Sequence, residues 1–77
     1  MRFILRGKAY DLAKVEVEEK MEGITPEVIH KYYVVVNGKN YPPKQVLGEI
    51  LRLSRVEFTT MDATNVLRRL FFELGQL

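Results

Sequence analysis

Cysteine is absent from this chain of 77 residues, which removes disulfide bonds, thiolate zinc sites and cysteine nucleophiles together. No apolar run approaches the roughly 18 residues of a membrane span, and the start MRFILRGKAYDL lacks the apolar region of a signal peptide. The phosphate-binding and nucleophile patterns G-x-x-x-x-G-K-[ST], G-x-G-x-x-G and G-x-S-x-G do not occur. We therefore expect a cytoplasmic protein that is not an enzyme and has no cofactor, membrane partner or small-molecule substrate.

Histidine is nearly absent, since His30 is the only one. No Ser, Cys or Asp stands at a spacing that would complete a catalytic pair with it, so a surface or structural role is expected. The clustered carboxylates of residues 16–22 are typical of a solvated face, and one histidine without cysteine does not make a metal site. We predict no catalytic residue and no bound metal.

The composition indicates a single compact domain over residues 1–77, with 47% hydrophobic and 29% charged residues. The net charge of +2 is small but unevenly distributed. Residues 11–30 carry a net charge of −4, residues 31–77 carry +3, and Arg2, Arg6 and Lys8 add +3 at the start. This polarity favours an anionic partner on a basic side, and the alternative is ordinary solvated charge.

A β-hairpin followed by a helix is predicted by VVVNGKNYPPK, residues 34–44. Asn37-Gly38 favours a two-residue type I′ turn because both residues tolerate positive φ. The strands would then pair Val34, Val35 and Val36 with Tyr41, Asn40 and Lys39. Neither Pro42 nor Pro43 can donate to a ladder, and proline suits the first turn of a helix, so the strand ends there and the helix begins.

Three further segments carry local signals. Gly7-Lys8 is typical of a type II′ turn and predicts short strands over residues 2–6 and 9–12. Residues 13–23 mix strand and helix formers and are interpreted as an irregular or short helical segment. A cap at Thr25 and a first-turn proline at Pro26 predict a short helix over residues 26–31.

Two longer amphipathic helices complete the predicted α+β fold. The first runs over residues 43–53, with a buried stripe of Val46, Leu47, Ile50 and Leu51. After a connection with Phe58 buried, Thr59 and Asp62 match a capping box. In the last helix, the side chains expected to face the core are those of Ala63, Val66, Leu67, Leu70, Phe71 and Leu74. Gly75 is expected to end this helix. The helix pair is helix-turn-helix-like only, because its connection exceeds the usual turn of about three to four residues.

The outer face of the last helix carries side chains that suit nucleic acids. Thr and Arg suit phosphates, and Asn and Arg can form bidentate hydrogen bonds with base edges. The candidates there are Thr64, Asn65, Arg68 and Arg69, beside Met61 and Phe72. A second group runs from the hairpin tip along the preceding helix and comprises Lys39, Lys44, Gln45, Arg52 and Arg55. The alternatives are a solvated helix face and a lysine that only aids solubility at the hairpin tip.

Aromatic side chains offer a second kind of surface. A large aromatic side chain on a polar helix face usually packs against another group. We therefore expect Phe72 to stack, to pack under the N-terminal strands or to lie in a protein contact. One member of the pair Tyr32-Tyr33 should face the core, while the other packs or stacks on a base.

The run YVVVNGKNYPPKQVL, with Phe58-Thr59 and the later VLRRL, resembles short prokaryotic proteins that share the scheme V-x-V-N-G-x-x-Y-P-x-K-Q-V … F-T … A-x-x-x-L-R-R-L-G-F. It resembles, more distantly, the G-x-x-Y-P-x-K module found beside HNH-type restriction endonucleases, whose nuclease chemistry belongs to another domain. The resemblance covers residues 33–72 and implies a DNA-associated role carried by Tyr41, Pro42, Lys44 and Gln45. Where the scheme has Leu-Gly-Phe, this chain has Leu70-Phe71-Phe72, so a longer helix is expected.

The sequence thus predicts a non-catalytic DNA-binding module or small regulator. Asn65, Arg68 and Arg69 would meet the DNA, while Lys39, Lys44 and Arg55 hold phosphates. The alternative is a protein-interaction module or homodimer that uses Phe72, an exposed strand edge and the acidic residues 16–27.

Overall fold

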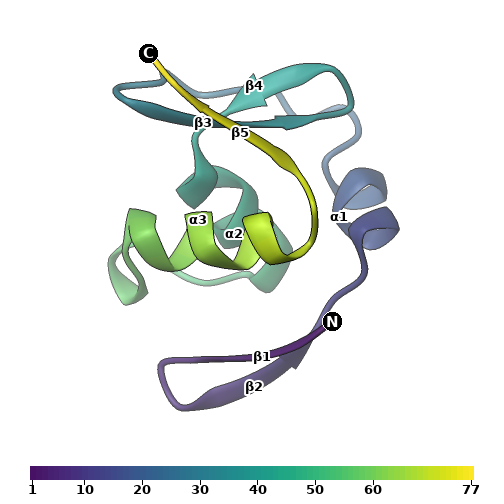
Figure 1. Cartoon of the computed structure of the whole chain (residues 1–77), viewed down its shortest axis with the longest axis vertical. Coiled ribbons are helices and arrows are strands. Elements are labelled where there is room, and N and C mark those ends of the chain that lie inside the picture. Colours follow the sequence, from purple (N-terminus) through teal and green to yellow (C-terminus); the bar gives the residue numbers. More distant parts are fainter.

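The fold has three layers in the computed structural model, which describes residues 1–77 throughout. Figure 1 shows a three-stranded antiparallel sheet, two helices beneath it and a two-stranded hairpin below the helices, with a third helix along one flank. The α+β class is confirmed. None of the helices combines the length and apolarity that a membrane crossing requires.

The elements follow in chain order, and η1 is a single 3₁₀ turn: β1 (Arg2–Leu5), β2 (Lys8–Asp11), α1 (Lys14–Lys20), β3 (Tyr32–Val36), β4 (Lys39–Tyr41), α2 (Pro43–Leu51), η1 (Arg55–Glu57), α3 (Thr60–Arg69) and β5 (Glu73–Gln76).

The N-terminal hairpin forms as predicted, but its turn lies one residue earlier than expected. Arg6 and Gly7 both have positive φ, 53° and 78°, which makes a type I′ rather than a glycine-first turn. The β1–β2 ladder therefore ends at the pair Leu5 and Lys8. Arg6 Nε donates to the Glu57 carbonyl oxygen at 2.9 Å, which ties this turn to η1.

The second hairpin confirms the Asn37-Gly38 prediction in turn and in register. Both turn residues have positive φ, and β3 pairs with β4 through Val34–Tyr41, Val35–Asn40 and Val36–Lys39. Pro43 opens α2 as its first residue. The Asn37 side chain donates to the Glu18 carbonyl oxygen at 2.8 Å, so the hairpin tip rests on α1.

The core lies between the sheet, the helices and β1. Val34 and Val36 face it from β3, and Phe3 and Leu5 face it from β1. The predicted stripe of α2 is buried except for the partly exposed Leu51, and Phe58 is buried as predicted. The buried residues of α3 and the turn after it include the expected Ala63, Val66, Leu67 and Leu70.

The helix predicted over residues 26–31 does not form. This segment has no regular secondary structure, because its backbone groups bond to distant partners instead of to each other. The Gln45 side chain accepts from Glu27 N and donates to the Thr25 carbonyl oxygen, each at 2.9 Å. At the other end, Leu77 N donates to the Lys31 carbonyl oxygen.

The last helix ends before Phe71, which corrects the prediction of a longer one. Phe71 has a φ of 67°, and its N–H donates to the Arg68 carbonyl oxygen while Phe72 N donates to that of Leu67. These two bonds define a Schellman motif, whose left-handed position usually holds glycine. Phe71 therefore points outward with 86% of its surface exposed, and Phe72 is buried at 6% exposed. The predicted burial of the two residues is reversed.

β5 was not predicted, and it completes the sheet on the other side of β3. It pairs antiparallel with β3 through Tyr32–Gln76, Tyr33–Gly75, Val34–Leu74 and Val35–Glu73. Gly75 lies within this strand and does not end a helix. A Cβ at Gly75 would lie 2.3 Å from Tyr33 Cζ, so the glycine lets the Tyr33 ring lie across the strand.

Candidate nucleic-acid interface

Two concavities adjoin at Tyr32, the first residue of β3. The helix concavity, about 340 Å³, opens between α3 and the paired ends of β3 and β5 and includes Met61, Thr64, Arg68 and Gln76. The loop concavity, about 330 Å³, opens beside the start of α2 and includes His30, Lys31, Lys44 and Arg55. Tyr32 lines both concavities, and the two together are called the depression.

The face of α3 explains how the helix concavity forms. Thr60, Thr64 and Arg68 follow one another at helical spacing and lie on one side of α3. Tyr32 shares a sheet face with the buried Val34, because side chains two residues apart in a strand point the same way. Gln76 lies opposite Tyr32 in the ladder. One wall is therefore helix, and the other is the end of the sheet.

The charge of this depression is positive. No carboxylate lines the helix concavity, and Glu27 is the only one that lines the loop concavity. Glu27 is neutralised by Arg55, so the charges of Lys31, Lys44 and Arg68 remain uncompensated. Lys31 Nζ lies 5.2 Å from the centre of the Tyr32 ring, which places a cation beside the shared aromatic.

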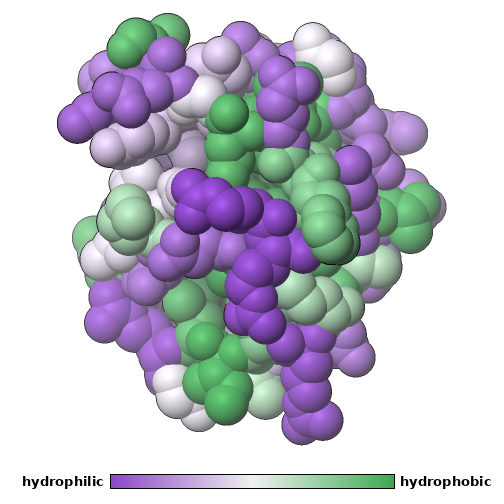
Figure 2. All heavy atoms as spheres, viewed as in Figure 1, coloured by the Kyte–Doolittle hydropathy of each residue, from purple (hydrophilic) through white to green (hydrophobic).

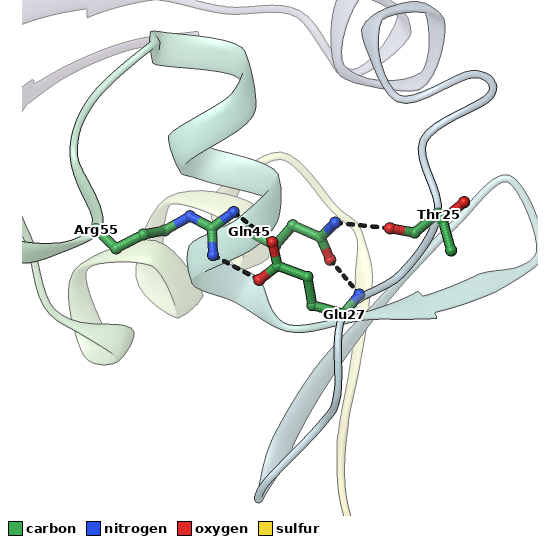
Figure 3. Close-up of polar contacts among 4 residues, drawn as sticks. All are labelled: Thr25, Glu27, Gln45 and Arg55. Carbon is green, nitrogen blue, oxygen red and sulfur yellow. Dashed lines mark hydrogen bonds and ion pairs between the residues drawn. The ribbon is translucent and has the colours of Figure 1, made fainter.

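The wall of the loop concavity is fixed by the contacts drawn in Figure 3. Arg55 donates two hydrogen bonds to the Glu27 carboxylate, at 2.6 and 2.8 Å, while Gln45 binds the backbone on either side of Pro26. Gly48 allows this arrangement, since a Cβ there would lie only 3.1 Å from Arg55 Nε. The hydrogen bond from Arg55 lowers the pKa of Glu27, and the carboxylate in turn raises the pKa of Arg55.

The Glu27–Arg55 pair predicts a dependence of stability on acid. Because the pKa of Glu27 is lower in the folded state, the pair stabilises above the ordinary carboxyl pKa and loses its effect as the pH falls through the lowered value. Because both side chains are nearly half exposed, we expect the pair to add at most about 1 kcal/mol to the free energy of unfolding. Thermal midpoints of the wild type and Glu27→Gln should differ at neutral pH and converge in acid. The exposed Glu19→Gln serves as control, and a pH-independent difference for Glu27→Gln would contradict the assignment.

The structure brings together some of the predicted site residues and separates others. Lys44 and Arg55 share the loop concavity, and Arg68 lines the helix concavity, which shares Tyr32 with it. Asn65 accepts from Arg68 at 3.2 Å and is exposed. Arg52 lines a different hollow with Arg55 and Glu49. Arg69 is exposed but lines neither concavity of the depression.

Lys39 lies apart from the depression. It lines a separate hollow with Glu22 and Asn37, where the hairpin tip meets the end of α1. Glu22 is the one carboxylate that lines this hollow, and Lys39 and Arg68 line different hollows.

Three predicted binding residues are largely buried. Gln45 is 2% exposed and its amide is used by the loop backbone, so it positions the wall and is not free to contact a partner. Thr64 is 6% exposed, on the edge of the buried side of α3. Phe72 is buried because the Schellman turn directs it inward, and Lys14 Nζ lies 5.1 Å from its ring centre.

Several residues of the depression were missed by sequence reasoning. His30, Lys31 and Gln76 were not proposed as binding residues, although Tyr32 was considered for stacking. The only available signal was the basic and aromatic run HKYY, which became informative once β5 and α3 were placed against it.

Two other kinds of site were considered, a metal site and an apolar docking surface. No three His, Cys, Asp or Glu side chains are grouped so that they could hold a metal ion. Figure 2 shows apolar side chains interspersed with hydrophilic ones on the face in view, with no single broad apolar patch. The exposed large apolar residues come from separate elements: Ile4, Val15, Val28, Val56, Met61, Phe71 and Leu77.

Comparison with known proteins identifies the family. The family model described as SCO5918-like matches residues 1–76, and the chain belongs to that family. No curated protein and no solved structure matches the chain.

Proposed function

We propose that this SCO5918-like protein is a non-catalytic nucleic-acid-binding module that binds through the depression around Tyr32. The proposal is supported by one observation: Lys31, Lys44 and Arg68 line two concavities that share the partly exposed Tyr32, and the only carboxylate among the lining residues, that of Glu27, is paired with Arg55. Cations of this kind bind phosphates, and an aromatic ring offers a stacking surface to any base.

DNA is the preferred nucleic acid in this proposal because of the Y-P-x-K resemblance. Tyr41 is buried and donates to the Ile24 carbonyl oxygen at 2.8 Å, and Pro42 stands at the N-cap of α2. Together they hold Lys44 in the first turn of α2, at the rim of the depression. The distant resemblance to a module beside HNH-type endonucleases supports a DNA-associated setting for that lysine.

Removing one lysine charge and one arginine charge from the depression tests the proposal. For Lys44→Ala/Arg68→Ala, we expect affinity for a labelled single strand to fall at least about tenfold at about 50 mM salt. The slope of log K against log salt should become shallower by about 1.4, because each lost phosphate contact to a single strand contributes about 0.7. Fluorescence anisotropy at about 50 and about 200 mM salt measures both quantities.

The matched control is Lys20→Ala/Arg69→Ala, which removes the same charge outside the depression. Arg69 is the neighbour of Arg68 on α3, so the control also tests the broader basic helix face expected from the sequence. We expect this variant to keep most of its affinity. If both double variants lose affinity equally, general charge and not the depression governs binding.

A protein-interaction module is the alternative, and it would use Phe71 instead of Phe72. Phe71 is the one exposed phenylalanine, with 86% of its surface accessible. It occupies the left-handed position of the Schellman motif, which directs its side chain outward. Binding of this kind would depend little on salt and would be lost in Phe71→Ala.

A further inference from the structure

The helix concavity holds a polar group that the fold leaves without a partner. Thr64 lines the concavity and is 6% exposed, and its Oγ1 is the one buried side-chain nitrogen or oxygen in the chain that has no hydrogen-bond partner. A buried hydroxyl without a partner costs free energy, so such groups in native proteins call for a specific explanation. A ligand group entering beside Thr64 would supply the missing bond.

The other lining residues match the chemistry of a nucleobase with its phosphate. Tyr32 offers a ring, and Gln76, opposite it in the ladder, is exposed and carries an amide that can both donate and accept. Arg68 stands across the concavity on α3, with Asn65 bound to its guanidinium. Ring, amide, hydroxyl and guanidinium are the groups that stack on a base, read its edge and hold its phosphate.

We propose that the helix concavity receives one unpaired base, stacked on Tyr32 and hydrogen-bonded by Thr64 and Gln76, so that the protein selects single strands over duplexes. This rests on the proposed function and specifies its substrate class. A paired base is held in its stack, and bringing it into a concavity between a helix and a sheet end requires unpairing, which a single strand does not need.

The first experiment compares one labelled strand of about 12 nucleotides with the same strand in a duplex, a length within the span of a small binding domain. We expect the single strand to bind at least about tenfold more tightly. Equal affinities that both fall with salt would overturn base insertion and leave the proposed function standing. No binding to either probe at about 50 mM salt would overturn both.

Variants then locate the base. Thr64→Val removes only the hydroxyl and is expected to weaken single-strand binding about fivefold without lowering the melting temperature, because the unpartnered group stabilises nothing in the free protein. Thr64→Ser should keep the affinity. Tyr32→Leu should lose about tenfold on single strands and little on the duplex. Wild-type affinity in both Thr64→Val and Tyr32→Leu would overturn the proposal.

Discussion

Replacing Phe72 with alanine is expected to unfold much of the protein at ambient temperature, whereas the same change at Phe71 should leave it folded. Phe72 is 6% exposed and belongs to the core, so its loss removes apolar burial and leaves a cavity at a cost of about 3–5 kcal/mol. That cost is comparable to the whole stability of a domain this small, about 3–5 kcal/mol. Urea denaturation followed by circular dichroism measures the difference.

Phe71 provides the matched control, since it is the next residue and undergoes the same substitution. It is 86% exposed, and its φ of 67° is unfavourable for any side chain with a Cβ. Phe71→Gly should therefore raise the free energy of unfolding by about 1 kcal/mol. Glycine is also what the resembling scheme carries at this position. Equal losses in Phe72→Ala and Phe71→Ala would show that the chain turns differently after α3.

Gln45→Ala is expected to destabilise by about 2 kcal/mol and to lower the melting temperature by about 8–16 °C. Gln45 is 2% exposed, and both ends of its amide are used: the oxygen by Glu27 N and the nitrogen by the Thr25 carbonyl oxygen. Truncation leaves both backbone groups without partners and a cavity under the loop. Thermal unfolding by calorimetry measures the loss.

Two further variants test whether the loss comes from the Gln45 amide itself or from any substitution in α2. Glu49→Ala changes an exposed residue one turn later and should cost little. Gln45→Glu keeps the shape and the acceptor but cannot donate when ionised, so it should be destabilising at neutral pH and partly recover in acid, where the carboxyl gains a proton. A Gln45→Ala protein as stable as Glu49→Ala would mean that the loop does not depend on this amide.

Features of the fold that depend on neighbouring residues were predictable from the sequence. Asn37-Gly38, Pro43 and the Thr59–Asp62 capping box each act within a few positions, and each lies where expected. Two of the errors have distant causes. Residues 26–31 carry a sound helix start, yet their backbone binds Gln45, and β5 is a short strand whose only partner lies about forty residues earlier, as Val34–Leu74 shows.

The candidate site was predictable only in part for the same reason. Lys44 and Arg68 could be named from charge and helical spacing, but nothing local shows that they line two concavities that share Tyr32. Gln45 and Phe72 were assigned to the surface because α2 and α3 were treated as isolated amphipathic helices. The loop over Gln45 and the left-handed turn at Phe71 bury them, and neither feature appears in a helical pattern.

The order of β4, β3 and β5 has a consequence during synthesis on the ribosome. β3 is the central strand, and it acquires β4 almost at once but must wait for β5 until α3 has been made. In that interval the valine-rich β3 presents one row of unpaired backbone groups to its surroundings. Such an edge is a template for pairing with another nascent chain, so the short strand Glu73–Gln76 closes the site at which two incomplete copies would join.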